Sequence, residues 1–236
     1  MFVVAEREYE TRKTLPEFAR NVLGARHGLR YTFLHVNPGD PWDIPGLEVL
    51  DDADALVLSV RRRALPEKQL AAIRRYLEAG KPLVAIRTSS HAFDTRGAVR
   101  ERPGYADWPA FDTEVLGGDY EGHHRGQDAS ESTFVWRLDA ARSHPILRGV
   151  SPGELKVRSW LYKTRPLAET ATPLMMGRAG DRKPHQPVAW TNTYRGGRIF
   201  YTSLGHPDDF RDKTFQRLLA NAVLWALERE VPGPAR

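Results

Sequence analysis

The sequence predicts an α/β domain in which helices cover both faces of a central, mostly parallel sheet that continues into an antiparallel extension. The runs at 54–60 and 82–86 are apolar almost throughout, as expected for parallel strands that are covered on both faces. Helical patterns alternate with these strands, which favours right-handed βαβ units and a doubly wound sheet. With 41% hydrophobic residues and no low-complexity linker, residues 1–236 are best interpreted as a single domain.

The parallel half is predicted from four short apolar segments and from the helical patterns that separate them. Thr14-Leu-Pro-Glu17 resembles a capping box that begins a helix, with Thr14 as the cap. A later helix has its apolar residues on one face and ends at Gly80. The predicted strands are 2–5, 31–36, 54–60 and 82–86, and the predicted helical segments are 14–23, 44–50 and 66–79.

The second half is expected to be antiparallel. Arg195-Gly-Gly197 is typical of a hairpin turn between two strands, and an apolar stripe from Phe215 to Ala226 predicts a final helix. Between the halves, the loop-rich residues 94–132 are expected to lie over the carboxyl ends of the strands as a lid. The strands expected in this half are 133–138, 156–162, 171–176, 187–191 and 198–203.

The composition narrows the class of protein. The chain has no cysteine, which excludes disulfides, thiolate nucleophiles and thiolate metal sites. Its 35 Lys and Arg residues are spread among 30 Asp and Glu residues, and because phosphate tracking needs a concentrated basic face, we expect no nucleic-acid partner. No segment approaches the roughly 20 apolar residues of a membrane span, and the first residues do not resemble a signal peptide. We therefore expect a cytoplasmic protein without a membrane partner.

A polar turn directly follows the strand at 82–86. Ligands of open α/β sheets bind at the carboxyl ends of the strands, so side chains of this turn are candidates for binding or chemistry. These candidates are Arg87, Thr88, Ser89 and His91.

The spacing of small residues predicts which residue lies at the tip of this turn. A strained elbow needs small residues two before and two after its tip. Ala85 and Ser89 satisfy this requirement for a tip at Arg87, whereas a tip at Thr88 would place the bulky Ile86 at the first of these positions. We therefore predict that Arg87 presents a fixed positive charge at the tip. Thr88 and Ser89 are expected to cap the helix that follows.

Five short motifs occur in a characteristic order along the chain. They are residues 80–91, Leu116-Gly-Gly-Asp-Tyr-Glu-Gly-His123, Ser143-His-Pro-Ile146, Pro187-Val-Ala-Trp190 and Gly197-Arg-Ile-Phe-Tyr-Thr-Ser-Leu-Gly-His206. In these motifs and their order, nearly the whole chain resembles the trehalose-utilisation, or ThuA-like, family, which is similar in fold to class I glutamine amidotransferases. The resemblance implies a flavodoxin-like, amidotransferase-type fold and a link to sugar metabolism.

The amidotransferase comparison implies a second set of candidates. Those enzymes carry a nucleophile on the strand-to-helix elbow and, much later, a His-Pro-Glu element that supplies the base and its orienting acid. His206-Pro-Asp208 stands in that later place here. Arginine is no nucleophile because its guanidinium stays protonated, and without cysteine glutaminase chemistry is excluded. A hydrolase that combines Thr88 or Ser89 with His206 and Asp208 is an alternative.

Four histidines are expected at strand ends or in the lid: His91, His123, His124 and His206. A general acid or base role suits one of the last three. Neither H-x-x-x-H nor H-E-x-x-H spacing is present, and adjacent histidines on an extended strand point to opposite sides. The sequence therefore leaves the metal and the cofactor open, with a divalent metal as one option.

The remaining candidates flank the predicted elbow. In the flavodoxin-like strand order 2-1-3-4-5, the first and third strands meet at the crevice, which places Glu6, Tyr9 and Arg61 near Arg87. These residues are expected to bind the ligand, or alternatively to form a partly buried ion-pair network.

Two aromatic residues are further candidates, because Trp160 and Tyr162 offer a stacking face for a sugar ring or, alternatively, belong to the core. The chain also departs from the family pattern. Many members carry histidine at the place of Arg87 and an acidic pair near Ser159 and Trp160. Both departures bear on whether the chemistry of the family is retained.

These observations favour one hypothesis over two alternatives. The leading hypothesis is a ThuA-like protein that binds a small molecule at the carboxyl ends of the strands. This ligand would be a sugar or a sugar derivative, with an oxidised derivative as one option. Arginines would hold the ligand oxygens and a histidine would transfer protons, so that an enzyme of this kind would be a lyase or hydrolase acting on a carbohydrate derivative. The alternatives are a non-catalytic binding or assembly module and the hydrolase described above. Each is compatible with a homo-oligomer.

Overall fold

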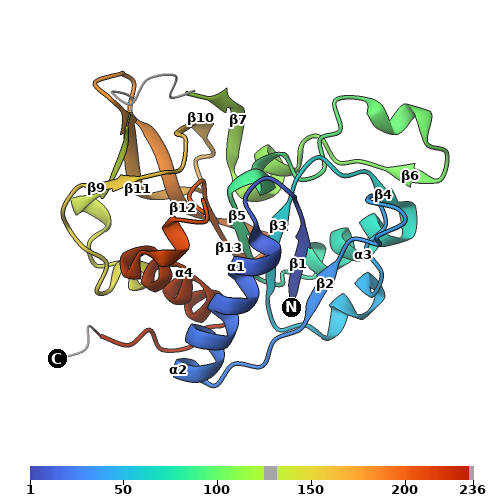
Figure 1. The fold of residues 1–236 in the computed structure, drawn as a ribbon, viewed down its shortest axis with the longest axis horizontal. Helices are drawn as coiled ribbons and strands as arrows, with labels where there is room; N and C mark the ends of the chain where they lie inside the picture. Colours follow the sequence, from blue (N-terminus) through green and yellow to red (C-terminus); the bar gives the residue numbers. More distant parts are fainter. Residues whose placement is uncertain (125–131, 234–236) are drawn as a thin grey trace.

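The computed structural model describes residues 1–124 and 132–233 and contains a nine-stranded sheet flanked by helices (Figure 1). The strands of this sheet are β1 (Phe2–Ala5), β2 (Phe33–His35), β3 (Leu56–Val60), β5 (Leu83–Ile86), β8 (Thr133–Arg137), β9 (Leu155–Val157), β11 (Thr172–Ala179), β12 (Gln186–Tyr194) and β13 (Gly197–Thr202). Two small sheets pair β4 (Leu65–Pro66) with β6 (Tyr105–Ala106) and β7 (Gly118–His123) with β10 (Tyr162–Leu167). The α-helices are α1 (Thr11–Phe18), which continues through a π-helical segment (Ala19–Gly24) into α2 (Ala25–His27), α3 (Glu67–Glu78) and α4 (Lys213–Ala226).

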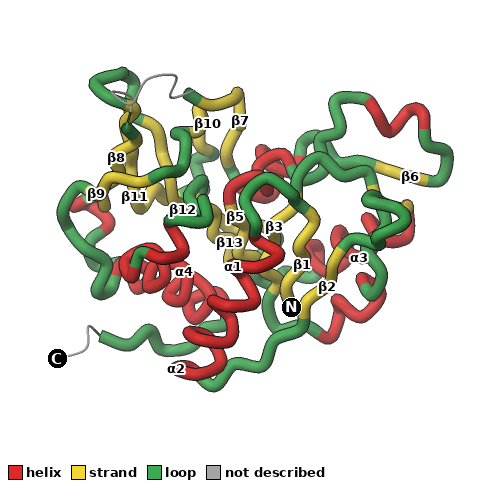
Figure 2. Tube along the Cα trace, viewed as in Figure 1, coloured by secondary structure: helices red, strands yellow, loops and turns green. Residues whose placement is uncertain are grey.

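The large sheet is parallel at one end and antiparallel at the other, as predicted. Its strand order is β2-β1-β3-β5-β13-β12-β11-β8-β9, and the first five strands are parallel neighbours. From β13 onward each neighbour pairs antiparallel. The predicted α/β fold class is confirmed. The carboxyl ends of β1 and β3 lead into loops, and that of β5 leads into a short 3-10 helix, at the edge of the sheet where the candidate site lies (Figure 2).

Each face of the sheet builds its own hydrophobic core, because successive side chains of a strand point to opposite faces. In β1, Phe2 and Val4 join the core that α1 and α4 cover, whereas Val3 and Ala5 join the core that α3 covers. Burial of both faces explains why β1, β3 and β5 are apolar at nearly every position.

The first helix begins earlier than predicted, and Thr14 does not cap it. α1 begins at Thr11, and Thr14 lies inside it with its backbone N donating to the Glu10 carbonyl at 3.1 Å. The carboxylate of the buried Glu6 binds the helix start instead, accepting from the backbone N of Tyr9 at 2.7 Å and of Thr11 at 2.8 Å. The capping-box prediction was wrong because a carboxylate from the preceding loop satisfies these N–H groups.

The strand predicted at 156–162 is two short strands in different sheets. β9 ends at Val157 and β10 begins at Tyr162. Between them, the buried Ser159 donates its hydroxyl to Asp209 at 2.6 Å, which holds the chain in a bend. The bend takes Trp160 out of the sheet and leaves its side chain 43% exposed.

Part of the predicted lid is packed into the domain. Trp108, Phe111 and Val115 are buried in the core on the α3 side of the sheet, so the stretch that contains them forms a wall of that core. β7 instead pairs with β10 beyond the end of β5 (Figure 1). Residues 125–131 of the predicted lid lie outside the described residues.

The predicted turns at Gly80 and at Arg195-Gly196 are confirmed. Gly80 follows α3 with a φ of 72°, and Arg195 and Gly196 both have positive φ in the β12–β13 hairpin. The two turns approach each other closely, since a Cβ on Gly197 would lie 2.7 Å from the Gly80 carbonyl oxygen. Glycine is therefore required at this contact.

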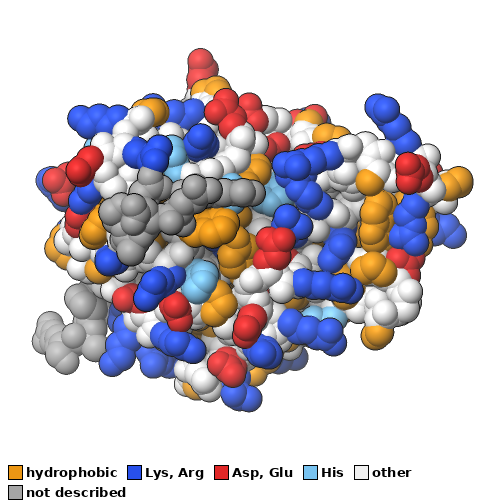
Figure 3. Space-filling view, turned by 45° about the horizontal axis from the view of Figure 1, so that its top comes forward, with side chains coloured by type: hydrophobic (Ala, Val, Ile, Leu, Met, Phe, Trp, Pro, Cys, Tyr) orange, Lys and Arg blue, Asp and Glu red, His pale blue; other side chains and the backbone are white. Residues whose placement is uncertain are grey.

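None of the helices within the described ranges is long and apolar enough to cross a membrane. On the face that carries the carboxyl ends of the strands, Lys and Arg side chains are interspersed with Asp and Glu (Figure 3). The cytoplasmic location, the absence of a nucleic-acid partner and self-association stay predictions from the sequence.

Candidate functional site

Arg87 lies at the tip of the turn after β5. Its φ of 48° places a non-glycine residue in the left-handed region, a strained conformation. Residues 87–91 form a short 3-10 helix rather than the start of an α-helix. Two contacts hold the tip: the Tyr201 hydroxyl donates to the Arg87 carbonyl at 2.6 Å, and Gly205 packs against Ile86 from below, where a Cβ would lie 2.7 Å from Ile86 Cγ2.

The Arg87 side chain is only 2% exposed and lies against two tyrosines. Its Cζ is 4.1 Å from the centroid of the Tyr9 ring and 5.0 Å from that of Tyr162. Nη1 donates to the Ser203 carbonyl at 2.7 Å, whereas Nε has no partner among the described residues. Burial opposes the charged form, but Tyr162, Tyr9 and Asp209 together hold the pKa of Arg87 above its usual value. The guanidinium is therefore a permanent cation.

A cavity of about 410 Å³ opens beside this guanidinium. The residues that line it are Glu8 and Tyr9 after β1, Arg87 at the elbow, Arg158 and Trp160 in the bend between β9 and β10, and His206 after β13. His123, at the end of β7, extends the aromatic wall, because its ring centroid is 5.0 Å from that of Trp160. The cavity thus combines a fixed cation, an exposed indole and an imidazole.

Asp209 holds the loop that carries His206. Its buried Oδ2 accepts three hydrogen bonds, from Ser159 Oγ at 2.6 Å, from the Gly205 backbone N at 2.9 Å and from the His206 backbone N at 3.1 Å. One carboxylate therefore connects the loop after β13 to the bend that carries Trp160, and it sets the relative positions of two walls of the cavity.

The predicted acid–base element is only partly assembled. His206 lines the cavity, and its Nδ1 accepts from the Asp208 backbone N at 3.2 Å. Asp208 Oδ2 is 3.6 Å from the same ring nitrogen, while Asp208 Oδ1 pairs with Arg211 at 2.9 Å. The backbone contact at Nδ1 fixes the orientation of the imidazole and leaves Nε2 as its other polar atom.

The hydroxyls of the elbow are not brought to His206. Ser89 Oγ donates to the Leu58 carbonyl at 2.8 Å and accepts from the Val60 backbone N at 3.2 Å, which ties it to β3. Thr88 Oγ1 is buried and has no partner among the described residues. Neither side chain caps the turn, so the predicted capping role was wrong: the end of β3 binds Ser89 instead. The hydroxyl–imidazole hydrogen bond that a hydrolase needs is not formed.

His91 is buried beneath Tyr120 instead of lining the cavity. The two rings stack with centroids 4.4 Å apart, and Ser90 Oγ is 3.0 Å from His91 Nδ1. Burial, reinforced by Arg62 and other nearby arginines, lowers the pKa of His91 to about 2. The imidazole is therefore neutral at physiological pH.

This low pKa predicts a pH-dependent loss of stability. Below the ordinary histidine pKa of 6.5, the unfolded chain binds a proton at residue 91 that the folded chain does not. The free energy of unfolding should therefore fall by about 1.4 kcal/mol for each pH unit below that value. His91→Phe keeps the ring stacked on Tyr120 and should remove this slope, which urea unfolding between about pH 7 and about pH 5 will measure. Equal slopes in both proteins would show that His91 titrates normally.

The other predicted ligand-binding residues surround the cavity without lining it. Glu6 caps α1, and Arg61 pairs with Glu8 at the cavity rim at 3.1 Å. His124 donates its backbone N to the Leu161 carbonyl at 2.8 Å, and Tyr162 is buried behind Arg87. Of the residues that the sequence singled out, the structure brings Tyr9, Arg87, Trp160 and His206 together at the cavity.

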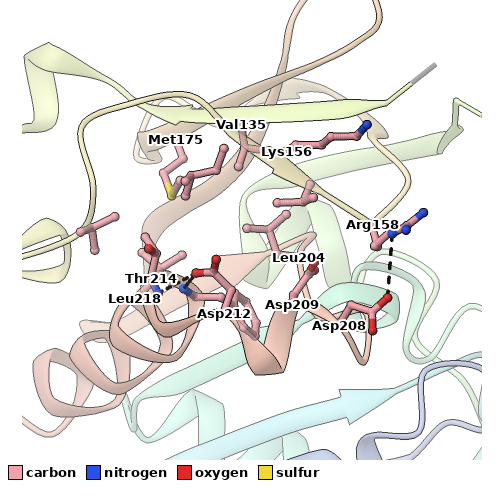
Figure 4. Close-up of a pocket in the computed structure, with 14 residues that line it drawn as sticks. Val135, Lys156, Arg158, Met175, Leu204, Asp208, Asp209, Asp212, Thr214 and Leu218 are labelled. Carbon is pink, nitrogen blue, oxygen red and sulfur yellow. Dashed lines mark hydrogen bonds and ion pairs between the residues drawn. The ribbon is translucent and has the colours of Figure 1, made fainter. Parts of the chain in front are cut away.

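A smaller cavity of about 130 Å³ lies on the other side of the 205–209 loop, between α4 and the antiparallel strands (Figure 4). Apolar side chains such as Val135 and Met175 form much of its wall. Its acidic groups have structural partners: Asp212 caps α4 by accepting from two backbone N atoms, and Asp209 holds the loop. Across residues 1–124 and 132–233, no three His, Asp or Glu side chains are grouped to hold a metal ion.

Sequence reasoning missed Glu8, Arg158 and Asp209. Arg158 was missed because residues 156–162 were predicted to form one strand, whereas Arg158 lies in the bend between β9 and β10. The signal for Asp209 was the pair of aspartates after His206-Pro207, of which only the first was considered. Nothing in the local sequence shows which of Asp208 and Asp209 holds the loop, because that role depends on a hydrogen bond from the distant Ser159.

The comparisons with known proteins agree with the architecture. The family model for trehalose utilisation, ThuA, matches residues 22–226, and no match is found among curated proteins. A ThuA-like protein from Bacteroides uniformis is 16% identical with a TM-score of 0.68, over 98% of this chain and 91% of that chain. One from Parabacteroides merdae is 15% identical with a TM-score of 0.66, over 99% and 91%. Agd3, a carbohydrate deacetylase, is 14% identical with a TM-score of 0.63, over 96% of this chain and 32% of that chain.

Proposed function

Since this chain belongs to the trehalose-utilisation (ThuA) family, we propose that it binds a sugar or sugar-derived small molecule in the cavity beside Arg87. The observation that carries the proposal is the exposed indole of Trp160 in a cavity that also presents Arg87, Tyr9 and His206. An aromatic face packs against the C–H surface of a sugar ring, and the polar groups bind its hydroxyls and fix its orientation.

The dimensions and the relatives support this proposal. A volume of about 410 Å³ falls within the range of roughly 300–1,000 Å³ that is usual for small-molecule sites. The cavity lies at the carboxyl ends of β1 and β5, where open α/β sheets bind their ligands. A part amounting to 32% of Agd3, a carbohydrate deacetylase, shares the fold of this chain. That likeness concerns the fold, and a carbohydrate ligand for this chain is our inference.

His206 is the group best placed for proton transfer. Because Nδ1 accepts from the Asp208 backbone N, the neutral ring carries its proton on Nε2. His206 is therefore arranged to donate a hydrogen bond from Nε2 to a ligand oxygen. Transfer of that proton, as the general acid of a lyase or hydrolase acting on a carbohydrate derivative, uses the imidazolium form, in which Nδ1 also carries a proton and lies 3.6 Å from Asp208 Oδ2. Thr88 and Ser89 have no part in this arrangement.

Trp160→Ala tests the sugar-binding proposal. Removing the indole deletes the stacking face, so the affinity for any sugar that binds should fall about tenfold, equivalent to about 1.4 kcal/mol. Stability should change by less than about 1 kcal/mol, because the side chain is 43% exposed. Calorimetric titration with a panel of monosaccharides, disaccharides and their oxidised forms measures the effect.

Trp136→Ala is the matched control. Trp136 on β8 also packs beside a histidine, with its centroid 5.1 Å from that of His185, but it does not line the cavity. Its removal should leave sugar affinity unchanged. The proposed site is wrong if no sugar of the panel binds the wild-type protein. It is also wrong if both tryptophan variants bind a sugar with the same affinity as the wild-type protein.

A further inference from the structure

We propose that the ligand of this cavity is a sugar acid, and that its carboxylate binds the guanidinium of Arg87. This inference rests on the proposed function and adds the chemical class of the ligand. It follows from the balance of charge around the cavity, because buried charges in proteins are normally paired.

Within the described residues, the guanidinium of Arg87 has no acidic partner at ion-pair distance. None of the ion pairs among the described residues includes Arg87. Its Nη1 is bound to a neutral carbonyl, that of Ser203, and its Nε has no partner within the described chain. The rings of Tyr9 and Tyr162 stabilise a cation but do not neutralise it. Asp209 favours the charged form of Arg87 through space, but no carboxylate of the described residues makes an ion pair with this buried charge at the wall of the cavity.

Two carboxylates close to the cavity, those of Glu8 and Asp209, have other partners. Glu8 lines the cavity, but it pairs with Arg61 at 3.1 Å. Asp209 uses Oδ2 to bind Ser159 and the backbone N atoms of residues 205 and 206. These two acids hold the walls of the cavity in place and are not available to move toward Arg87 without breaking those contacts.

A second arginine makes the cavity more positive. Arg158 lines it from the rim with its side chain 76% exposed, and its contact with Asp208 Oδ2 is 4.0 Å long. Asp208 pairs more closely with Arg211, at 2.9 Å. The open mouth therefore attracts anions, while Arg87 provides the fixed point that holds them.

One buried guanidinium matches one negative charge, which is the charge of a carboxylate at neutral pH. A phosphate monoester carries nearly two, and its second charge would find only the exposed Arg158. Guanidinium and carboxylate are both planar and bind each other in one plane. The protein also maintains Arg87 in a strained backbone conformation, a feature that concentrates at ligand-binding sites.

The test compares sugars that differ at C6, where one carries a carboxylate and the other a neutral hydroxymethyl group. The methyl pyranosides of glucose, galactose and mannose are compared by calorimetric titration with the methyl glycosides of the corresponding uronic acids (the uronides), whose C6 carboxylate is free. In at least one of the three series, the uronide should bind at least ten times more tightly than the neutral glycoside. Arg87→Met should abolish that preference. Arg198→Met, the control, removes an arginine that also donates Nη1 to a carbonyl and lies 5.3 Å from an aromatic ring, but at the other end of β13.

A second comparison needs no variant, and so stands even if Arg87→Met does not fold. The uronamide keeps the planar group and loses the charge, and it should bind wild-type protein at least tenfold more weakly than the uronide. Equal binding of uronide, uronamide and neutral glycoside would overturn the sugar-acid assignment and leave the proposed function intact. Tighter binding of a sugar phosphate, or a preference for uronide that survives in Arg87→Met, would also overturn it. Binding of no sugar at all would overturn both.

Discussion

Asp209→Ala is expected to lower the free energy of unfolding by about 3 kcal/mol or more and to abolish ligand binding. The reason is that Oδ2 satisfies two buried donors, Ser159 Oγ and the Gly205 backbone N, and also accepts from the partly buried His206 backbone N, which has a second acceptor in Ser159 Oγ at 3.2 Å. Each donor left without a partner costs about 1–3 kcal/mol. The same change releases the loop that carries His206 from the bend that carries Trp160, so two walls of the cavity lose their relative position.

The adjacent aspartate gives a matched control for this variant. Asp208 is half-exposed and pairs with the exposed Arg211, so Asp208→Ala should cost less than about 1 kcal/mol. Asp209→Asn keeps an oxygen that can accept the three bonds and should be milder than Asp209→Ala. Chemical denaturation and calorimetry of the three variants measure both effects. Equal costs at 208 and 209 would contradict the role given to Asp209.

Gly205→Ala is expected to destabilise the protein by about 3 kcal/mol and to displace the elbow. The backbone at Gly205 has a φ of 129°, where a residue with a Cβ is strained by about 1–3 kcal/mol. Its added Cβ would lie 2.7 Å from Ile86 Cγ2 and 3.7 Å from Arg87 Cβ, and such overpacking costs about 1–3 kcal/mol more. The clash pushes directly on the residues that form the tip.

Gly122→Ala separates the two causes. Gly122 has a nearly identical φ of 135° but nothing within 4 Å of the position of its Cβ, so this variant should show the backbone strain alone. In thermal or urea unfolding, Gly205→Ala should therefore be less stable than Gly122→Ala. Indistinguishable stabilities would mean that the elbow can relax away from Gly205, contrary to the tight packing described above.

The parts of the fold that were predicted correctly depend on local patterns. Parallel strands such as β3 and β5 are apolar because both of their faces are buried, and this property appears directly in the sequence. The position of Arg87 at the tip also follows from local sterics, since the cramped backbone requires small neighbours. The observed φ of 48° agrees with that reasoning.

The parts that were missed depend on contacts between distant segments. Glu6 replaces Thr14 as the helix cap because the loop after β1 folds back onto α1. Trp160 enters the cavity because Ser159 is bound to Asp209, 50 residues later. His91 leaves the crevice because Tyr120 on β7 covers it. No periodicity or spacing in one segment contains this information.

The central claim, that the cavity beside Arg87 binds a sugar-derived ligand, is tested most directly by a crystal structure of the protein soaked with neutral sugars and sugar acids. The expected result is a sugar ring stacked on Trp160, with an oxygen within hydrogen-bond distance of Arg87 or His206. The claim would be contradicted by an empty cavity at saturating ligand, or by ligand density only in the smaller cavity between α4 and the antiparallel strands.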